Sequence, residues 1–87
     1  MIDMESWTKK RVECDEKRHF ISMRVVAIRW IQLNRELSEN ENRKLEEEEK
    51  ELIDEYSNVT DEIIALELER LQEHYRHSVS NDQVKLL

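Results

Sequence analysis

The sequence predicts an all-α fold, a long antiparallel helical hairpin, and three observations lead to this prediction. The 87 residues include no glycine and no proline, whereas tight β-turns depend on residues with positive or fixed φ. Charged residues make up 40% of the chain, and a composition rich in Glu, Lys, Arg and Leu is typical of long helices and coiled coils. The apolar residues recur with helical periodicity, which favours amphipathic helices even though the mean hydropathy is only −0.87.

The first helix is expected over residues 4–36, with Asp3 or Ser6 as its N-cap. Its apolar residues form two faces, although a helix on the surface of a small domain needs only one. The broad arc comprises Val12, Phe20, Met23, Val26, Ala27, Trp30, Ile31, Leu33 and Leu37. The narrow stripe comprises Ile21, Val25 and Ile28. We expect the broad arc to serve the hairpin. The narrow stripe then has two interpretations: the first helix is central and is buried on both sides by its own chain, or the stripe contacts another chain.

The second helix is expected over residues 39–77, and a clear boundary signal precedes it. Ser38 and Glu41 fit a capping box, in which Ser38 caps the helix and Glu41 reaches back. A tight reversal there would fold the second half of the chain along the first. A seam with heptad-like spacing follows, which predicts coiled-coil-like packing with Glu49 at one core position. The seam comprises Leu45, Leu52, Tyr56, Val59, Ile63 and Leu66.

An alternative concerns residues 57–60, where Thr60 precedes two acidic residues and is a credible N-cap. A break there would give three helices in place of two. A continuous or kinked helix is favoured because the seam runs through this segment without interruption. Past Ile63 the apolar stripe moves round the helix, to Ile64, Leu68, Leu71 and Tyr75. Residues 1–77 are expected to form one helical domain, and residues 78–87 a C-terminal tail.

Charge is unevenly distributed along the chain, whose formal net charge is −7. Residues 1–37 hold eight Lys and Arg against six acids, whereas residues 38–87 hold six against fifteen. This asymmetry suits antiparallel packing of the two halves. The single cysteine, Cys14, excludes an internal disulfide and suggests a reducing compartment. With no secretory signal and no apolar run long enough for a bilayer, the sequence predicts a cytoplasmic protein that binds no membrane.

No catalytic, cofactor-binding or metal-binding motif stands out, and we do not expect an enzyme. His74 and His77 have a spacing that can present two imidazoles to a metal ion, but no third ligand is well placed. Cys14 and His19 point to different sides of a helix, so they do not resemble a nucleophile and its base. The chain also lacks the glycine-rich loop that a phosphate site would use.

The sequence therefore predicts a small acidic protein–protein interaction module that acts as an adaptor or inhibitor and forms a homodimer. The candidate partner-binding residues on its apolar faces are Trp7, Ile21, Val25, Ile28, Leu68, Leu71 and Tyr75. Trp7 is the preferred aromatic anchor because it lies outside the dense apolar zone.

An alternative function is mimicry of nucleic acid. The acidic run Glu46, Glu47, Glu48 and Glu49 could occupy the basic groove of a protein that binds DNA or RNA. Direct binding to nucleic acid is not expected for a chain with this net charge. In outline such an acidic helical chain resembles small phage-encoded inhibitors of host defence proteins, a resemblance of general type that no residue motif carries.

Overall fold

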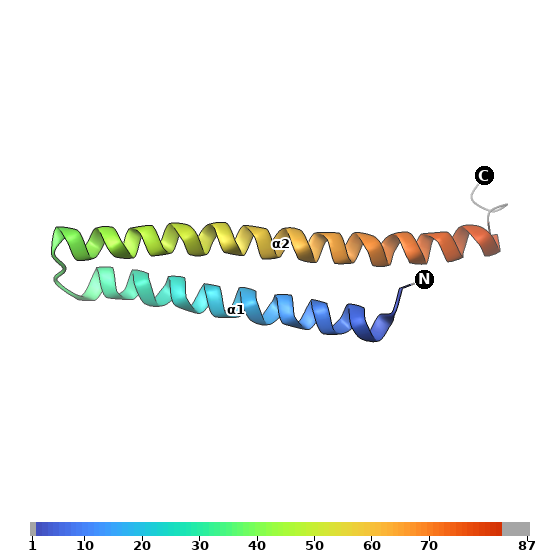
Figure 1. Cartoon of the computed structure of the whole chain (residues 1–87), viewed down its shortest axis with the longest axis horizontal. Coiled ribbons are helices and arrows are strands. Elements are labelled where there is room, and N and C mark those ends of the chain that lie inside the picture. Colours follow the sequence, from blue (N-terminus) through green and yellow to red (C-terminus); the bar gives the residue numbers. More distant parts are fainter. Residues whose placement is uncertain (1, 83–87) are drawn as a thin grey trace.

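The computed structural model describes residues 2–82, with side chains to residue 76, and consists of two helices. Helix α1 spans Met4–Asn34 and helix α2 spans Glu39–Asp82. They run antiparallel and side by side, and α2 extends past the start of α1 (Figure 1). The predicted all-α hairpin is therefore confirmed.

The hairpin is a single thin layer. Its radius of gyration is 20.2 Å and its principal extents are 67 × 27 × 16 Å, whereas a compact domain of this length has a radius of gyration of about 12 Å. Because each helix has only the other one to pack against, most of the surface of both helices faces outward.

Local hydrogen bonds fix where the helices begin. The carboxylate of Asp3 accepts from the backbone N–H of Glu5 at 3.1 Å, so Asp3 rather than Ser6 caps α1. At the start of α2 the capping box is confirmed. The backbone N–H of Glu41 donates to Ser38 Oγ at 3.1 Å, and the Glu41 carboxylate accepts from the backbone N–H of Ser38 at 3.4 Å. The four residues between the helices are thereby held in a tight reversal.

Helix α2 is continuous across residues 57–60, so the described chain has two helices and not three. The hydroxyl of Thr60 donates to the carbonyl of Tyr56 at 2.9 Å, an interaction typical of threonine inside a helix and not of a cap. The helix also continues to Asp82, past the predicted end at residue 77. Of the predicted C-terminal tail, residues 83–87 lie outside the described residues.

The core is a single line of side chains between the helices. On α1 the buried residues occur every seventh position, at Trp7, Cys14, Ile21 and Ile28. On α2 they are Val59 and Ile63. The half-buried residues packed against the core are Val25, Leu52, Tyr56 and Leu66. Every member of the predicted α2 seam is thus at least half-buried, because the seam faces α1.

The two apolar faces of α1 have the opposite roles to those predicted. The narrow stripe, here Ile21, Val25 and Ile28, packs against α2, and the broad arc points mostly outward. The reason is that polar residues extend the narrow stripe. Arg11 and Arg18 continue its line toward the start of α1, and both find partners on α2. The narrow stripe has only three apolar residues, and an apolar count omits the two arginines that lengthen its contact with α2.

Candidate interaction surfaces

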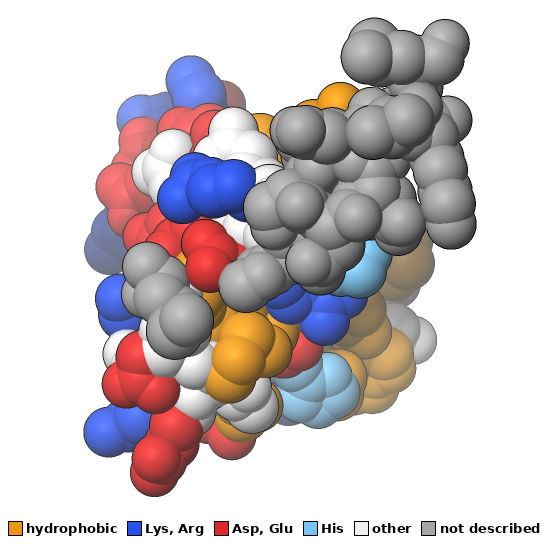
Figure 2. All heavy atoms as spheres, turned by 90° about the vertical axis from the view of Figure 1, so that its right-hand side faces the viewer, with side chains coloured by type: hydrophobic (Ala, Val, Ile, Leu, Met, Phe, Trp, Pro, Cys, Tyr) orange, Lys and Arg blue, Asp and Glu red, His pale blue; other side chains and the backbone are white. Residues whose placement is uncertain are grey.

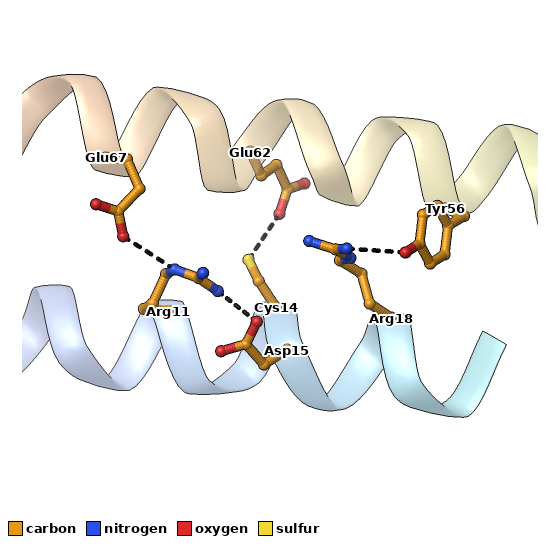
Figure 3. A network of polar contacts seen from close by, with 7 residues as sticks. All are labelled: Arg11, Cys14, Asp15, Arg18, Tyr56, Glu62 and Glu67. Carbon is orange, nitrogen blue, oxygen red and sulfur yellow. Dashed lines mark hydrogen bonds and ion pairs between the residues drawn. The ribbon is translucent and has the colours of Figure 1, made fainter. Parts of the chain in front are cut away.

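Polar contacts across the first half of α1 fix how the two helices are aligned (Figure 3). Arg11 Nε donates to Glu67 Oε1 at 3.2 Å, and the same guanidinium pairs with Asp15 one turn along α1. One heptad further, Arg18 Nη2 donates to the Tyr56 hydroxyl at 2.8 Å, with its guanidinium 4.9 Å from the ring centroid. Such contacts between a cation and an aromatic ring stabilise modestly, and their geometry specifies one alignment of the helices.

Trp7, the preferred candidate anchor, is used inside the hairpin. It is 9% exposed, and its indole N–H donates to the carbonyl of Leu66 at 2.8 Å. The guanidinium of Arg70 covers the ring at 5.2 Å from its centroid. Trp7 therefore fastens the start of α1 to α2. Of the other candidates on α1, Ile21 and Ile28 are likewise buried against α2, so none of the three is open to a partner in this structure.

The acidic run on α2 is partly occupied by arginines of α1. Arg24 binds Glu48 with two hydrogen bonds, of 2.8 and 3.0 Å, and this lowers the pKa of the Glu48 carboxyl below its ordinary value. Arg29 Nε donates to Glu49 Oε1 at 3.1 Å. Glu47 is exposed.

The other exposed member of the run, Glu46, accepts a hydrogen bond of 3.3 Å from the side chain of Asn42. Half of the acidic run therefore serves the contact between the helices.

Cys14 is buried in that contact, and its surroundings do not favour thiolate chemistry. Burial and a hydrogen bond of 3.5 Å from Sγ to Glu62 Oε2 raise the pKa of the thiol. A thiol with a raised pKa stays protonated and is a weak nucleophile. Among the described residues, no group of three or more potential ligands could hold a metal ion. The side chain of His77, one of the two histidines considered above, lies outside the described side chains.

The outward face of α1 has a heptad seam of its own. We call it the outer α1 seam, and it comprises Val12, Glu16, His19, Met23, Val26, Trp30 and Leu33. Steps of four and three residues alternate along it, and at 100° per residue it lies about 160° from the buried stripe. All seven residues are exposed, Trp30 by 55% and Leu33 by 85%. Phe20 and Ala27 flank this seam on one side, and Phe20 is 72% exposed.

A second exposed apolar surface lies toward the C-terminal end of α2. We call it the α2 stripe, and it comprises Ile64, Leu68, Leu71 and Tyr75, all exposed by half or more. Leu68, Leu71 and Tyr75 line a shallow hollow of about 550 Å³. Since Trp7 reaches Leu66, the last part of this stripe lies where α2 runs on beyond α1 (Figure 1).

Charge and apolar surface are separated around the hairpin axis. Figure 2 looks along the hairpin from the end at which α1 begins. Most charged side chains gather on one side, at the left, and hydrophobic side chains gather on the other, at the right (Figure 2). In the described part of the chain, neither helix contains an apolar stretch long enough to cross a membrane.

Comparison with known proteins yields no relative from which a function could be transferred. The chain matches no family model. No curated protein and no solved structure matches it either. A functional interpretation therefore depends on the two exposed surfaces described above and on the helix contacts that leave them exposed.

Proposed function

We propose that this chain is a small acidic interaction module that acts as an adaptor or inhibitor by presenting exposed helix faces to other protein chains. One observation carries the proposal. Among the described residues, twelve large hydrophobic side chains are exposed by 47% or more, whereas only six hydrophobic residues are buried. Soluble monomers rarely expose large contiguous apolar patches, and such patches mark sites of association.

The way in which the hairpin is built supports this proposal. The buried positions of α1 and the seam of α2 both have heptad spacing, which favours coiled-coil-like packing between the two helices. That packing buries the inner faces of both helices and gives an elongated hairpin. The outer α1 seam and the α2 stripe remain available as two separate surfaces, because the stripe lies roughly 130° round its helix from the α2 seam at 100° per residue.

The α2 stripe is the surface better suited to a different protein. Its residues follow the spacing with which an amphipathic helix enters an apolar groove. Tyr75, 63% exposed, provides an aromatic anchor of the kind that dominates interface energetics. The end of the stripe extends beyond α1, so a groove could enclose it without meeting the other helix. We therefore propose an apolar groove on a partner protein as the binding site for Leu68, Leu71 and Tyr75.

Mimicry of nucleic acid is the second candidate, and it has less support. The dense charge of the acidic run would have to face a basic groove. Glu48 and Glu49, however, are paired with Arg24 and Arg29, which neutralise half of the run. Averaged over the four residues of the run, about 6 Å of helix, the charges of Glu46 and Glu47 amount to about one per 3 Å, whereas duplex nucleic acid carries one per about 1.7 Å.

Site-specific photo-crosslinking in the native host tests the proposed function. A photoreactive residue is placed at Leu71, and the matched control carries it at Asn58, an exposed position on another face of the same helix. We expect a defined adduct from Leu71 and none from Asn58. The crosslinked protein, once purified, should bind the wild-type chain and lose at least tenfold in affinity for Leu71→Glu, with Asn58→Glu unaffected. Equal adducts at both positions, or equal affinity of both variants, would contradict the proposal.

A further inference from the structure

We infer that the outer α1 seam binds a second copy of this chain, antiparallel to the first, so that two hairpins associate through a central pair of α1 helices. This inference rests on the proposed interaction function, but it concerns a different helix and a different surface from the one assigned to a different protein. It divides the two exposed surfaces: α1 would join copies of the chain, and the α2 stripe would recruit the partner.

The spacing of the outer seam matches that of a helix-packing surface. It repeats the four-and-three alternation of the buried face of α1 for three heptads, from Val12 to Leu33. An apolar repeat of 3.5 residues keeps one face toward a partner helix along its whole length. At 1.5 Å per residue the seam is about 32 Å long, enough for one helix of a second hairpin to lie along it.

The exposed area of the chain is sufficient for a dimer interface. The accessible surface is 7290 Å² for a mass of 10.7 kDa, whereas a compact monomer of this mass exposes about 5,500 Å². The chain therefore exposes about 1,800 Å² more than a compact monomer. A stable dimer of standard size buries about 800 Å² on each partner. Covering the outer α1 seam and its flanks would thus remove a large part of this additional surface.

The positions of the polar residues favour a second copy in an antiparallel orientation. A twofold axis passing between Met23 and Val26 would place Met23 of each copy against Val26 of the other copy. It would also bring His19 to Trp30 of the second copy and Glu16 to Leu33, so the carboxylate lies at the edge of the interface. A parallel pair would instead oppose Glu16 to Glu16, which repels. The surface is self-complementary under one twofold axis, as an isologous dimer requires.

The flanking residues and the overall charge agree with this arrangement. The same axis brings Phe20 of one copy beside Ala27 of the other, a large side chain against a small one, and this would cover the most exposed aromatic ring of α1. Association through α1 also places the mildly basic first halves of the two chains at the centre. The acidic α2 helices then lie outside, which limits the repulsion between chains of net charge −7.

Sedimentation equilibrium of the wild type and two matched variants tests the inference. Val26→Glu places a charge at the centre of the outer α1 seam, and Leu71→Glu places one on the α2 stripe. We expect wild type and Leu71→Glu to sediment at twice the 10.7 kDa chain mass, and Val26→Glu to sediment as a helical monomer. A wild-type monomer at ~100 μM, on the affinity scale of weak complexes, would overturn the inference, as would a dimer that Leu71→Glu dissociates and Val26→Glu does not.

Cysteine crosslinking tests the orientation without disturbing the rest of the chain. His19→Cys and Trp30→Cys are mixed and oxidised, with wild type as control because its Cys14 is buried. We expect a disulfide between the two variants and none within either variant alone. Crosslinking of each variant to itself would show a parallel pair and overturn the arrangement.

The two proposals can fail separately. If the chain is monomeric while Leu71→Glu still abolishes partner binding, only this inference fails. If the dimer forms and no partner binds at Leu71, only the role of the α2 stripe fails.

Discussion

The two faces of α1 have the same heptad spacing and opposite environments within the hairpin. Along the inner face, Trp7 and Ile28 are 9% and 0% exposed, whereas Trp30 on the outer face is 55% exposed. The outer face has more large apolar residues, yet the inner one packs against α2. The difference lies in the polar residues. Arg11 and Arg18 interrupt the inner face, and each has a specific partner on α2. Polar complementarity, rather than apolar content, selects which face closes the hairpin.

The largest effect is expected at Ile28, the most deeply buried residue of the inner face. Ile28→Ala should lower the free energy of unfolding by about 2–5 kcal/mol, because it removes packing from a fully buried site. Such a loss can unfold a domain with so thin a core. The matched outer variant Val26→Ala should lower the stability of the single hairpin by less than about 0.5 kcal/mol. Urea titrations followed by far-UV circular dichroism, at low chain concentration, measure both, and equal losses would show that the two faces do not differ.

A smaller effect is expected where the inner face is polar. Tyr56→Phe removes the hydroxyl that accepts from Arg18 and keeps the ring beneath the guanidinium. The expected loss is about 0.5–1.5 kcal/mol, the usual net contribution of one hydrogen bond. In a double-mutant cycle with Arg18→Met, the two changes should be strongly non-additive. Additive losses would mean that this contact does not help to select the inner face.

The smallest effect concerns the exposed ion pair between Arg24 and Glu48. Arg24 lowers the pKa of Glu48, so the folded chain holds the Glu48 proton less tightly than the unfolded chain. The stabilisation is therefore present above the unfolded pKa and is lost as the pH falls through the lowered folded pKa. Glu48→Gln should be slightly less stable than wild type at neutral pH, and the difference should vanish in acid. Urea titrations between about pH 7 and pH 2 check this, and a difference that grows in acid would contradict it.

Much of the fold was predictable because its signals are local. The capping box of Ser38 and Glu41 marks the turn, and the seam through Val59 and Ile63 marks the face of α2 that packs. The absence of glycine and proline predicted helices alone. Thr60 was misleading, because its hydroxyl can bond within a helix as well as at a cap.

The inner face of α1 could not be identified by counting apolar residues. Three of its seven heptad positions, Arg11, Cys14 and Arg18, are polar or small, and the contribution of the arginines depends on partners that lie far away in the sequence, such as Glu67 for Arg11. One signal was nevertheless present. Trp7, Cys14, Ile21 and Ile28 recur at intervals of seven residues, and two arginines follow at the intervening heptad positions. Matching these arginines with the acids and Tyr56 of α2 would have paired the correct faces and left the broad arc outside.

The chain's two tryptophans, one on each face of α1, allow the most direct test of the account. Trp7→Phe leaves Trp30 as the only indole, and Trp30→Phe leaves Trp7. We predict that acrylamide quenching of Trp30 is strong at nanomolar concentration and falls several-fold at ~100 μM, as a second copy covers the outer α1 seam. Quenching of Trp7 should be weak throughout, because α2 already covers it. Strong quenching of Trp30 at every concentration, with no change, would contradict the assignment of the outer face to a second copy.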